Sequence, residues 1–162
     1  MEDGDELVGF APSTDASDLV FITSDAQLLR TPADKVRPQG RTASGMAGIK
    51  LSDSAHVLGL WVIDAPEEAL VVTVAGAAGA LPGTGQTTAK VTPLSLYPFK
   101  GRGTQGVRVQ RFLRGEDRLD IAWVGENPRA ASADGSPVEL PAVDERRDGS
   151  GTPLTHAIAT IG

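Results

Sequence analysis

The sequence predicts an all-β protein built from repeated units of short strands, and three observations lead to that prediction. First, 19 glycines and 11 prolines in 162 residues divide the chain into short segments, which is typical of strands joined by turns. Second, the apolar segments are short and rich in valine, leucine and isoleucine. Third, Leu19, Leu70 and Ile121 each lead such a segment, and successive leaders are 51 residues apart. A repeat of this size, made of about four short strands, is typical of a propeller-like array.

The repeat also predicts how the chain is organised. A small sheet cannot bury both of its faces alone, so neighbouring units must stack, and about three units fit in this length. We therefore expect a single domain over residues 1–162, with repeats at approximately 18–64, 69–119 and 120–162, preceded by an acidic lead-in with a first strand at residues 1–17.

The first unit shows the strand pattern most clearly. Residues 19–23 (LVFIT) are β-branched and aromatic, which predicts a strand. A turn at 24–26 and the segment 27–31, which is ended by a proline, predict a hairpin. Beyond a loop rich in glycine and arginine, we expect strands at 46–51 and 56–63.

The second and third units repeat parts of this pattern. Residues 70–74 (LVVTV) match the first strand, and residues 80–82 match the end of its hairpin partner. Residues 107–112 and 120–124 are expected to pair around a turn, and 120–124 (DIAWV) also opens the third unit. We expect residues 137–141 to be the return strand of that unit.

Two further features complete the expected fold. The final segment, residues 154–161, either closes onto the first unit or forms an edge strand. Trp61 and Trp123 occupy the same place in successive units (HVLGLWV and RLDIAWV), which favours core packing for both.

Composition excludes several classes of protein. The chain has no cysteine, which excludes disulfides and cysteine-ligated zinc. It has no run of about 18 apolar residues, so we expect no membrane partner. His56 and His156 stand alone without paired ligand spacing, and no constellation of residues predicts catalysis, metal binding, a cofactor or a small-molecule substrate. We expect a cytoplasmic, non-enzymatic chain.

Charge is distributed unevenly along the chain. The net charge is −6, and residues 1–25 contain seven acids and no base. Residues 30–50 and residues 97–118 each have a local charge of +4. Both positive islands coincide with similar loops, in which Gly-Arg and small residues lead into a strand (GR…GIKL in 37–51 and GR…GVRV in 100–109). Basic side chains on glycine-rich loops can approach phosphate closely, and they can equally serve only to solubilise exposed loops, so the residues alone leave both interpretations open.

The blade-like segment LVFITSDAQLLRTPADKVRPQGRTASGMAGIKL resembles one blade of the C-terminal domain of bacterial type IIA topoisomerase A subunits, which are the A subunits of DNA gyrase and topoisomerase IV. The resemblance extends in weaker form to residues 69–125 and 120–154, and so covers nearly all of the chain. It implies a β-pinwheel, in which propeller-like blades exchange a strand with a neighbour. It also implies an accessory domain that binds or bends duplex DNA and guides strand passage, next to the nucleoid.

Together, charge and resemblance indicate a set of DNA-binding residues on the basic loops and adjoining strands: Arg30, Lys35, Arg37, Arg41, Lys50, Lys100, Arg102, Arg108 and Arg111. The resemblance places the cleavage tyrosine, ATP and magnesium in other domains or in the partner B subunit. Several arginines near Glu116, Asp117 and Asp120 are also expected to form surface ion pairs.

The sequence departs from the gyrase pattern at one motif. The A subunits of gyrase contain a box of the form QRRGGKG, whereas the nearest segments here are QGRTASG (39–45) and KGRGTQG (100–106). This difference favours a topoisomerase IV-like or divergent subunit. The alternative function is a divergent pinwheel that acts as a protein-interaction module without binding DNA.

Overall fold

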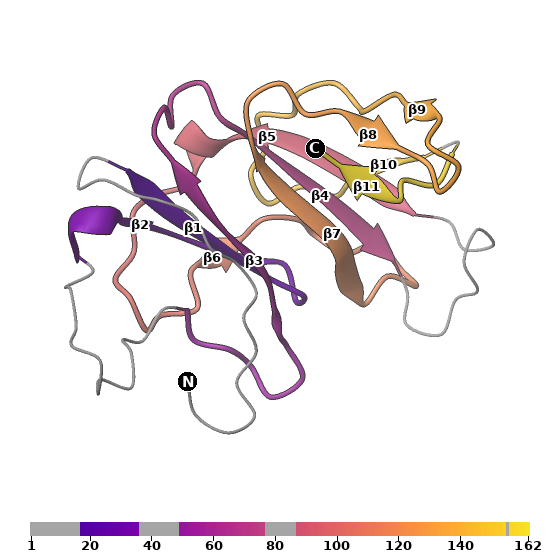
Figure 1. Ribbon diagram of the computed structural model, residues 1–162. Helices are drawn as coiled ribbons and strands as arrows, with labels where there is room; N and C mark the ends of the chain where they lie inside the picture. The colour runs from indigo at the N-terminus through magenta and orange to yellow at the C-terminus, as the bar shows by residue number, and fades with distance from the viewer. Residues whose placement is uncertain (1–16, 36–48, 77–86, 155) are drawn as a thin grey trace.

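The computed structural model describes residues 17–35, 49–76, 87–154 and 156–162. In these ranges the regular structure is β, apart from two short 3₁₀ helices, η1 (Ala33–Lys35) and η2 (Leu94–Leu96). Figure 1 shows the strands gathered in three antiparallel sheets that follow one another across the molecule. The all-β, propeller-like prediction is thus confirmed. No helix in these ranges is long and apolar enough to cross a membrane.

The first sheet has the strand order β3-β1-β2-β6. Its strands are β1 (Asp18–Thr23), β2 (Gln27–Pro32), β3 (Val57–Ile63) and β6 (Val107–Arg108). The predicted hairpin is confirmed, because β1 pairs with β2 and Leu19 faces Thr31. Its turn is closed locally: the Ala26 N–H donates to the Thr23 carbonyl at 3.1 Å, and the Gln27 N–H donates to the Thr23 hydroxyl at 3.1 Å.

The second sheet repeats this arrangement in the order β7-β4-β5-β10. Its strands are β4 (Leu70–Gly76), β5 (Thr88–Pro93), β7 (Arg118–Gly125) and β10 (Thr152–Pro153). The central strands β1 and β4 are equivalent, and each is irregular near its end, at Ile22/Thr23 and at Val74/Ala75. Trp61 faces the centre of β1 and Trp123 faces the same place on β4, which confirms that the two tryptophans are equivalent.

The repeat boundaries differ from the sequence prediction. Ile121 does not lead a third unit, because β7 pairs with β4 and forms one edge of the second sheet. The return strand of the second hairpin is β5, whereas the expected match at residues 80–82 lies outside the described residues. The prolines that end the return strands, Pro32 and Pro93, are 61 residues apart. The second hairpin has a longer connection than the first, so one fixed step of 51 residues cannot describe every strand.

Each of the first two sheets receives its last strand from a later part of the chain. Strand β6 follows β5 in the sequence but pairs with β2, with Leu28 opposite Val107. Strand β10 follows β9 but pairs with β5, with Ala89 opposite Thr152. The expected pairing of 107–112 with 120–124 is therefore wrong. Residues 107–108 pair instead with the free edge of β2, and β7 pairs with β4.

The third sheet is smaller and has the order β11-β8-β9. Its strands are β8 (Ala130–Ala131), β9 (Pro137–Val138) and β11 (Thr160–Ile161). The expected return strand at 137–141 is present over its first two residues. The final segment forms an edge strand, since β11 pairs only with β8 among the described residues. The first strand expected in the acidic lead-in, at residues 7–11, lies outside the described residues. Residues 49–51, the described part of the strand expected at 46–51, are not in a strand.

Two apolar clusters hold the three sheets together. The larger one joins the first two sheets and contains Val20, Ile22 and Leu28, all fully buried, together with Val71 and Leu119. Full burial of a side chain of this size contributes about 1.5–3 kcal/mol to stability. The smaller cluster joins the second and third sheets and includes Val74 and Ile158. The exchanged segments thus lie at sheet edges whose positions are set by packed cores.

Candidate nucleic-acid interface

Residues 98–109, here named the first crossing, leave the second unit and complete the first sheet. Their backbone is fixed to β2 at both ends: Phe99 forms a parallel bridge with Arg30, and the Lys100 N–H donates to the Arg30 carbonyl at 3.0 Å. At the other end, β6 pairs with β2 and the Val109 N–H donates to the Ala26 carbonyl at 2.9 Å. The second basic loop, residues 101–106, is therefore held between two anchored ends.

Glycines let this loop lie close to the sheet. Gly103 and Gly106 have φ of 81° and 78°, a region that favours glycine. A Cβ on Gly106 would lie 2.2 Å from the Leu28 carbonyl oxygen, so no larger residue fits without movement of the backbone. The Thr104 hydroxyl closes the loop by donating to the Gly101 carbonyl at 2.8 Å.

The end of the first basic loop contacts the second one. The Lys50 N–H donates to the Thr104 carbonyl at 2.7 Å, although the two residues are far apart in the sequence. Arg37 and Arg41, the other cations expected on the first loop, lie outside the described residues, as does the side chain of Lys35. The structure thus brings the residue that follows the first loop against the second loop.

The first crossing is strongly basic. Residues 98–109 contain Lys100, Arg102 and Arg108 and no acid. Lys50, Lys100 and Arg108 are exposed, and Arg102 is half-buried. In the part of the chain that the structure describes, Lys50, Lys100, Arg108 and Arg111 form no ion pair. Because no acid among the described residues pairs with them, these four charges remain available to a binding partner.

One of the expected surface ion pairs lies beside the acidic turn. Arg118 and Asp120 form an exposed pair at 2.9 Å, which confirms that some arginines beside this acidic turn are paired. Glu116 instead accepts hydrogen bonds from the Leu113 N–H at 2.6 Å and from the Thr88 hydroxyl at 2.5 Å.

Arg30 lies in a different setting from the loop cations. It forms an ion pair with Asp18 at 2.7 Å, and the two side chains are only 12% and 8% exposed. Its guanidinium also donates to the carbonyls of Tyr97 at 3.0 Å and Leu94 at 3.4 Å, and lies 4.3 Å from the centre of the Phe99 ring. Arg30 thus joins the first sheet to the first crossing, and we leave it out of the proposed interface.

Sequence reasoning missed a buried lysine on β5. Lys90 on β5 is 2% exposed, and its ammonium donates to the carbonyls of Val109, at 3.2 Å, and Arg147. Burial lowers the pKa of Lys90 to about 8, a shift that Asp144 and Asp148 oppose. A single lysine in TAKVTP has no periodicity or spacing that would have predicted this position.

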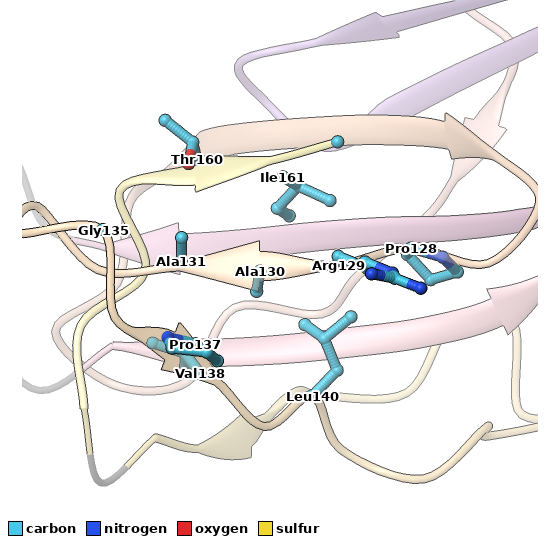
Figure 2. Close-up of a pocket in the computed structure, with 11 residues that line it drawn as sticks. Pro128, Arg129, Ala130, Ala131, Gly135, Pro137, Val138, Leu140, Thr160 and Ile161 are labelled. Carbon is cyan, nitrogen blue, oxygen red and sulfur yellow. The ribbon is translucent and has the colours of Figure 1, made fainter.

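An open cavity of about 590 Å³ is the other candidate site, and it lies on the third sheet. Figure 2 shows Leu140, Ile161 and Pro128 around it, with Arg129 beside Pro128. Its lining is mostly apolar. No group of three or more histidine, cysteine or acidic side chains suited to a metal ion occurs among the described residues.

The fold and the site together define a class of protein. Two four-stranded antiparallel sheets and a smaller third sheet stand in a row. The first two each take one edge strand from a later segment, and the segment exchanged into the first sheet is basic; this is a β-pinwheel. The profile of the family described as "DNA gyrase C-terminal domain, beta-propeller" matches residues 17–64 and 88–121, half of the chain. The chain belongs to that family, which confirms the resemblance found in the sequence.

Individual relatives agree with this assignment. The DNA gyrase A protein of Staphylococcus aureus (strain MRSA252) is 31% identical over 157 residues, an alignment that covers 81% of this chain and 16% of the relative. The chain therefore spans only a small part of that protein.

Solved structures agree in fold. A C-terminal domain of DNA topoisomerase IV superposes with a TM-score of 0.70 at 15% identity, over 91% of this chain and 46% of the other. The E. coli ParC C-terminal domain gives a TM-score of 0.68 at 18% identity, over 93% of this chain and 61% of the other.

Proposed function

We propose that this chain is a DNA-binding accessory domain of a type IIA topoisomerase A subunit, which binds or bends duplex DNA to guide strand passage. The observation that supports this most is the hydrogen bond from the Lys50 N–H to the Thr104 carbonyl, which joins the end of the first basic loop to the second loop, a contact that sequence alone could not place. Family membership supports the same function. Duplex DNA and the topoisomerase A and B subunits are the proposed partners, and the bacterial cytoplasm, at the nucleoid, is the proposed location.

The proposed binding is electrostatic and depends on DNA shape. Lys50, Lys100, Arg102 and Arg108 would contact phosphate oxygens from glycine-rich backbone, and arginine can do so through two N–H groups at once. Each neutralised phosphate releases counterions and contributes about −0.9 to the slope of log K against log salt. The described elements include no recognition helix, so we expect little direct reading of base sequence.

The chain itself performs no chemistry in this proposal. The cleavage tyrosine, ATP and magnesium would belong to other domains or to the partner B subunit. Tyr97, the single tyrosine of the sequence, is 1% exposed and its hydroxyl lies 2.7 Å from that of Thr92 in the core, so its environment is that of a structural residue.

The proposal is tested by fluorescence anisotropy with duplex DNA across a salt series. We expect micromolar or tighter binding with a steep salt slope. The triple variant Lys100→Ala, Arg102→Ala and Arg108→Ala should bind more weakly, with a slope smaller in magnitude by up to about 2.7. The double variant Arg129→Ala and Arg147→Ala, which removes two cations from other segments, is the control. Absence of binding at roughly 50 mM salt, a Debye length of about 14 Å, would contradict the proposal.

A protein-interaction module is the second candidate function. The net charge of −6 favours it, as do the acids Asp144, Glu145 and Asp148 on the segment that completes the second sheet. A chain of this kind would fail the DNA test above and would bind a topoisomerase subunit with an affinity that the triple variant does not change.

A further inference from the structure

Phe99 is an exposed aromatic residue in the middle of the basic first crossing. Phe99 is 51% exposed, and the next three residues are Lys100, Gly101 and Arg102. A single exposed apolar side chain is ordinary at a protein surface. The way in which Phe99 is held distinguishes it from such a residue.

The ring of Phe99 rests on a fixed cation. The Arg30 guanidinium carbon lies 4.3 Å from the ring centre, within the range of a cation–π interaction. Arg30 cannot move freely, because Asp18 and the carbonyls of Leu94 and Tyr97 bind its guanidinium. One part of the ring is therefore supported by the protein, while about half of the residue faces solvent.

The backbone on either side of the ring is fixed as well. Phe99 forms a parallel bridge with Arg30, and the Lys100 N–H donates to the Arg30 carbonyl at 3.0 Å. The exposed Phe99 and the exposed Lys100 thus stand next to each other on one short, anchored stretch, and Arg102 follows two residues later. An apolar side chain held in this way loses little conformational entropy when it meets a ligand.

The equivalent residue in the next unit shows that the fold does not require this arrangement. Val143 forms the same parallel bridge with Val91 and is 50% exposed, but it is aliphatic and is followed by Asp144 and Glu145. The stretch at Phe99 therefore combines an aromatic ring with cations, and the equivalent stretch at Val143 does not.

We propose that Phe99 is an apolar wedge that enters the minor groove of the duplex bound on the first crossing and contacts sugar and base at one base step. This inference rests on the proposed DNA-binding function and deepens it. Apolar side chains that enter between base steps partly unstack them and kink the duplex, while neighbouring cations hold the phosphates. Phe99 would then favour bent DNA, with Lys100 and Arg102 binding the backbone beside it.

Salt dependence separates this role from that of the cations. We expect Phe99→Ala to weaken duplex binding about tenfold, since contact between an aromatic ring and a base changes affinity by roughly 5- to 150-fold. The slope of log K against log salt should not change. Lys100→Ala should instead make the slope smaller in magnitude by about 0.9. Val143→Ala is the matched control and should change neither quantity.

DNA bending gives a second measurement. In a duplex labelled for energy transfer at its two ends, the wild-type chain should shorten the end-to-end distance. Phe99→Ala should shorten it less at saturating protein, and Phe99→Trp should restore both bending and affinity. Thermal unfolding of each variant checks that the fold is intact.

The outcomes also separate this inference from the function on which it rests. If Phe99→Ala binds and bends DNA like the wild type while Lys100→Ala loses affinity, Phe99 is no wedge and the DNA-binding proposal stands. If Phe99→Ala changes the salt slope as Lys100→Ala does, the loss is electrostatic and the wedge is again wrong. If the wild-type chain binds no DNA, both proposals fail.

Discussion

The first crossing, residues 98–109, and its equivalent in the next unit, residues 142–154 and here named the second crossing, follow the same path with different side chains. The Lys100 N–H donates to the Arg30 carbonyl, and the Asp144 N–H donates to the Val91 carbonyl at 2.7 Å. Each crossing then adds a two-residue strand, β6 or β10, to the sheet of the preceding unit. The backbone arrangement is therefore common to both crossings.

The side chains on this common path differ in charge. The first crossing has three cations and no acid, whereas the second has Asp144, Glu145 and Asp148 against Arg146 and Arg147. Two guanidinium nitrogens of Arg146 each donate a hydrogen bond to the Asp144 carboxylate at 3.1 Å. Backbone hydrogen bonds to sheet edges fix the path and leave side-chain charge free to vary. The comparison teaches that the basic charge suited to DNA belongs to particular loops rather than to the fold.

The largest expected effect comes from the ion pair that only the first unit has. The equivalents of Asp18 and Arg30 in the second sheet are Leu70 and Val91. Arg30→Val should lower the free energy of unfolding by about 3–5 kcal/mol, because it leaves the charge of Asp18 buried and unpaired. Asp18→Leu with Arg30→Val should recover most of this loss. Chemical denaturation measures both, and a double variant as unstable as the single one would contradict this explanation.

Each crossing has a glycine immediately before its two-residue strand, and the surroundings of the two glycines differ. Gly106→Ala should cost about 3 kcal/mol, since it combines a left-handed φ with a clash against the Leu28 carbonyl. Gly151→Ala should cost about 1–2 kcal/mol, because the atoms it meets belong to side chains. Gly115 has a φ of 93° and open space around it, so Gly115→Ala measures the cost of the left-handed backbone without a clash. Equal losses for Gly106→Ala and Gly115→Ala would show that the crossing can shift.

Lys90 gives the second unit a pH dependence that the first unit lacks, because its equivalent there is Leu29. Burial lowers the pKa of Lys90 to about 8, below its ordinary value of 10.5, so the unfolded chain binds more protons between these values. The free energy of unfolding should therefore rise with pH, by about 2 kcal/mol from roughly pH 8 to 9.5. Burial raises the pKa of Tyr97, which reverses the trend above about pH 10. Chemical denaturation of Lys90→Leu should show no such rise in the free energy of unfolding with pH. If the rise persists in this variant, another titratable group causes it.

A charge exchange tests whether the crossings differ in DNA affinity because of Lys100 and Asp144. Lys100→Asp should weaken duplex binding by at least about eightfold near 0.1 M salt, and Asp144→Lys should steepen the salt slope by about 0.9. Glu139→Lys makes the same charge change on an exposed residue of the third unit and serves as the control. Equal gains for Asp144→Lys and Glu139→Lys would mean that net charge alone controls binding.

The smallest expected effect concerns the exposed pair on the second crossing. Hydrogen bonds from Arg146 hold the pKa of Asp144 below its ordinary value. Arg146→Ala should let that pKa rise, as a carboxyl titration by NMR would show, while the melting temperature stays the same because solvent screens exposed pairs. A clear fall in melting temperature would instead mean that Arg146 helps to fix the second crossing.

Several features of the fold could be predicted from local sequence. Residues 19–23 predicted β1 because β-branched residues favour strands, and the turn at 24–26 predicted its hairpin. The equivalence of Trp61 and Trp123 followed from similar neighbours. The sequence placed cations on the second loop, and their role in binding stays a prediction. It did not single out the exposed ring of Phe99 or the buried Lys90.

By itself, the sequence determined the all-β class, the repeated units and the basic loops, because alternation, turn residues and charge act over a few neighbouring residues. The tertiary structure alone decided that β7 closes the second sheet, that β6 completes the first, and that Arg30 is buried against Asp18. A strand edge can pair with any segment that reaches it, and a charged side chain is buried only where a partner lies opposite. Both outcomes depend on contacts between residues distant in the sequence, which no local pattern specifies.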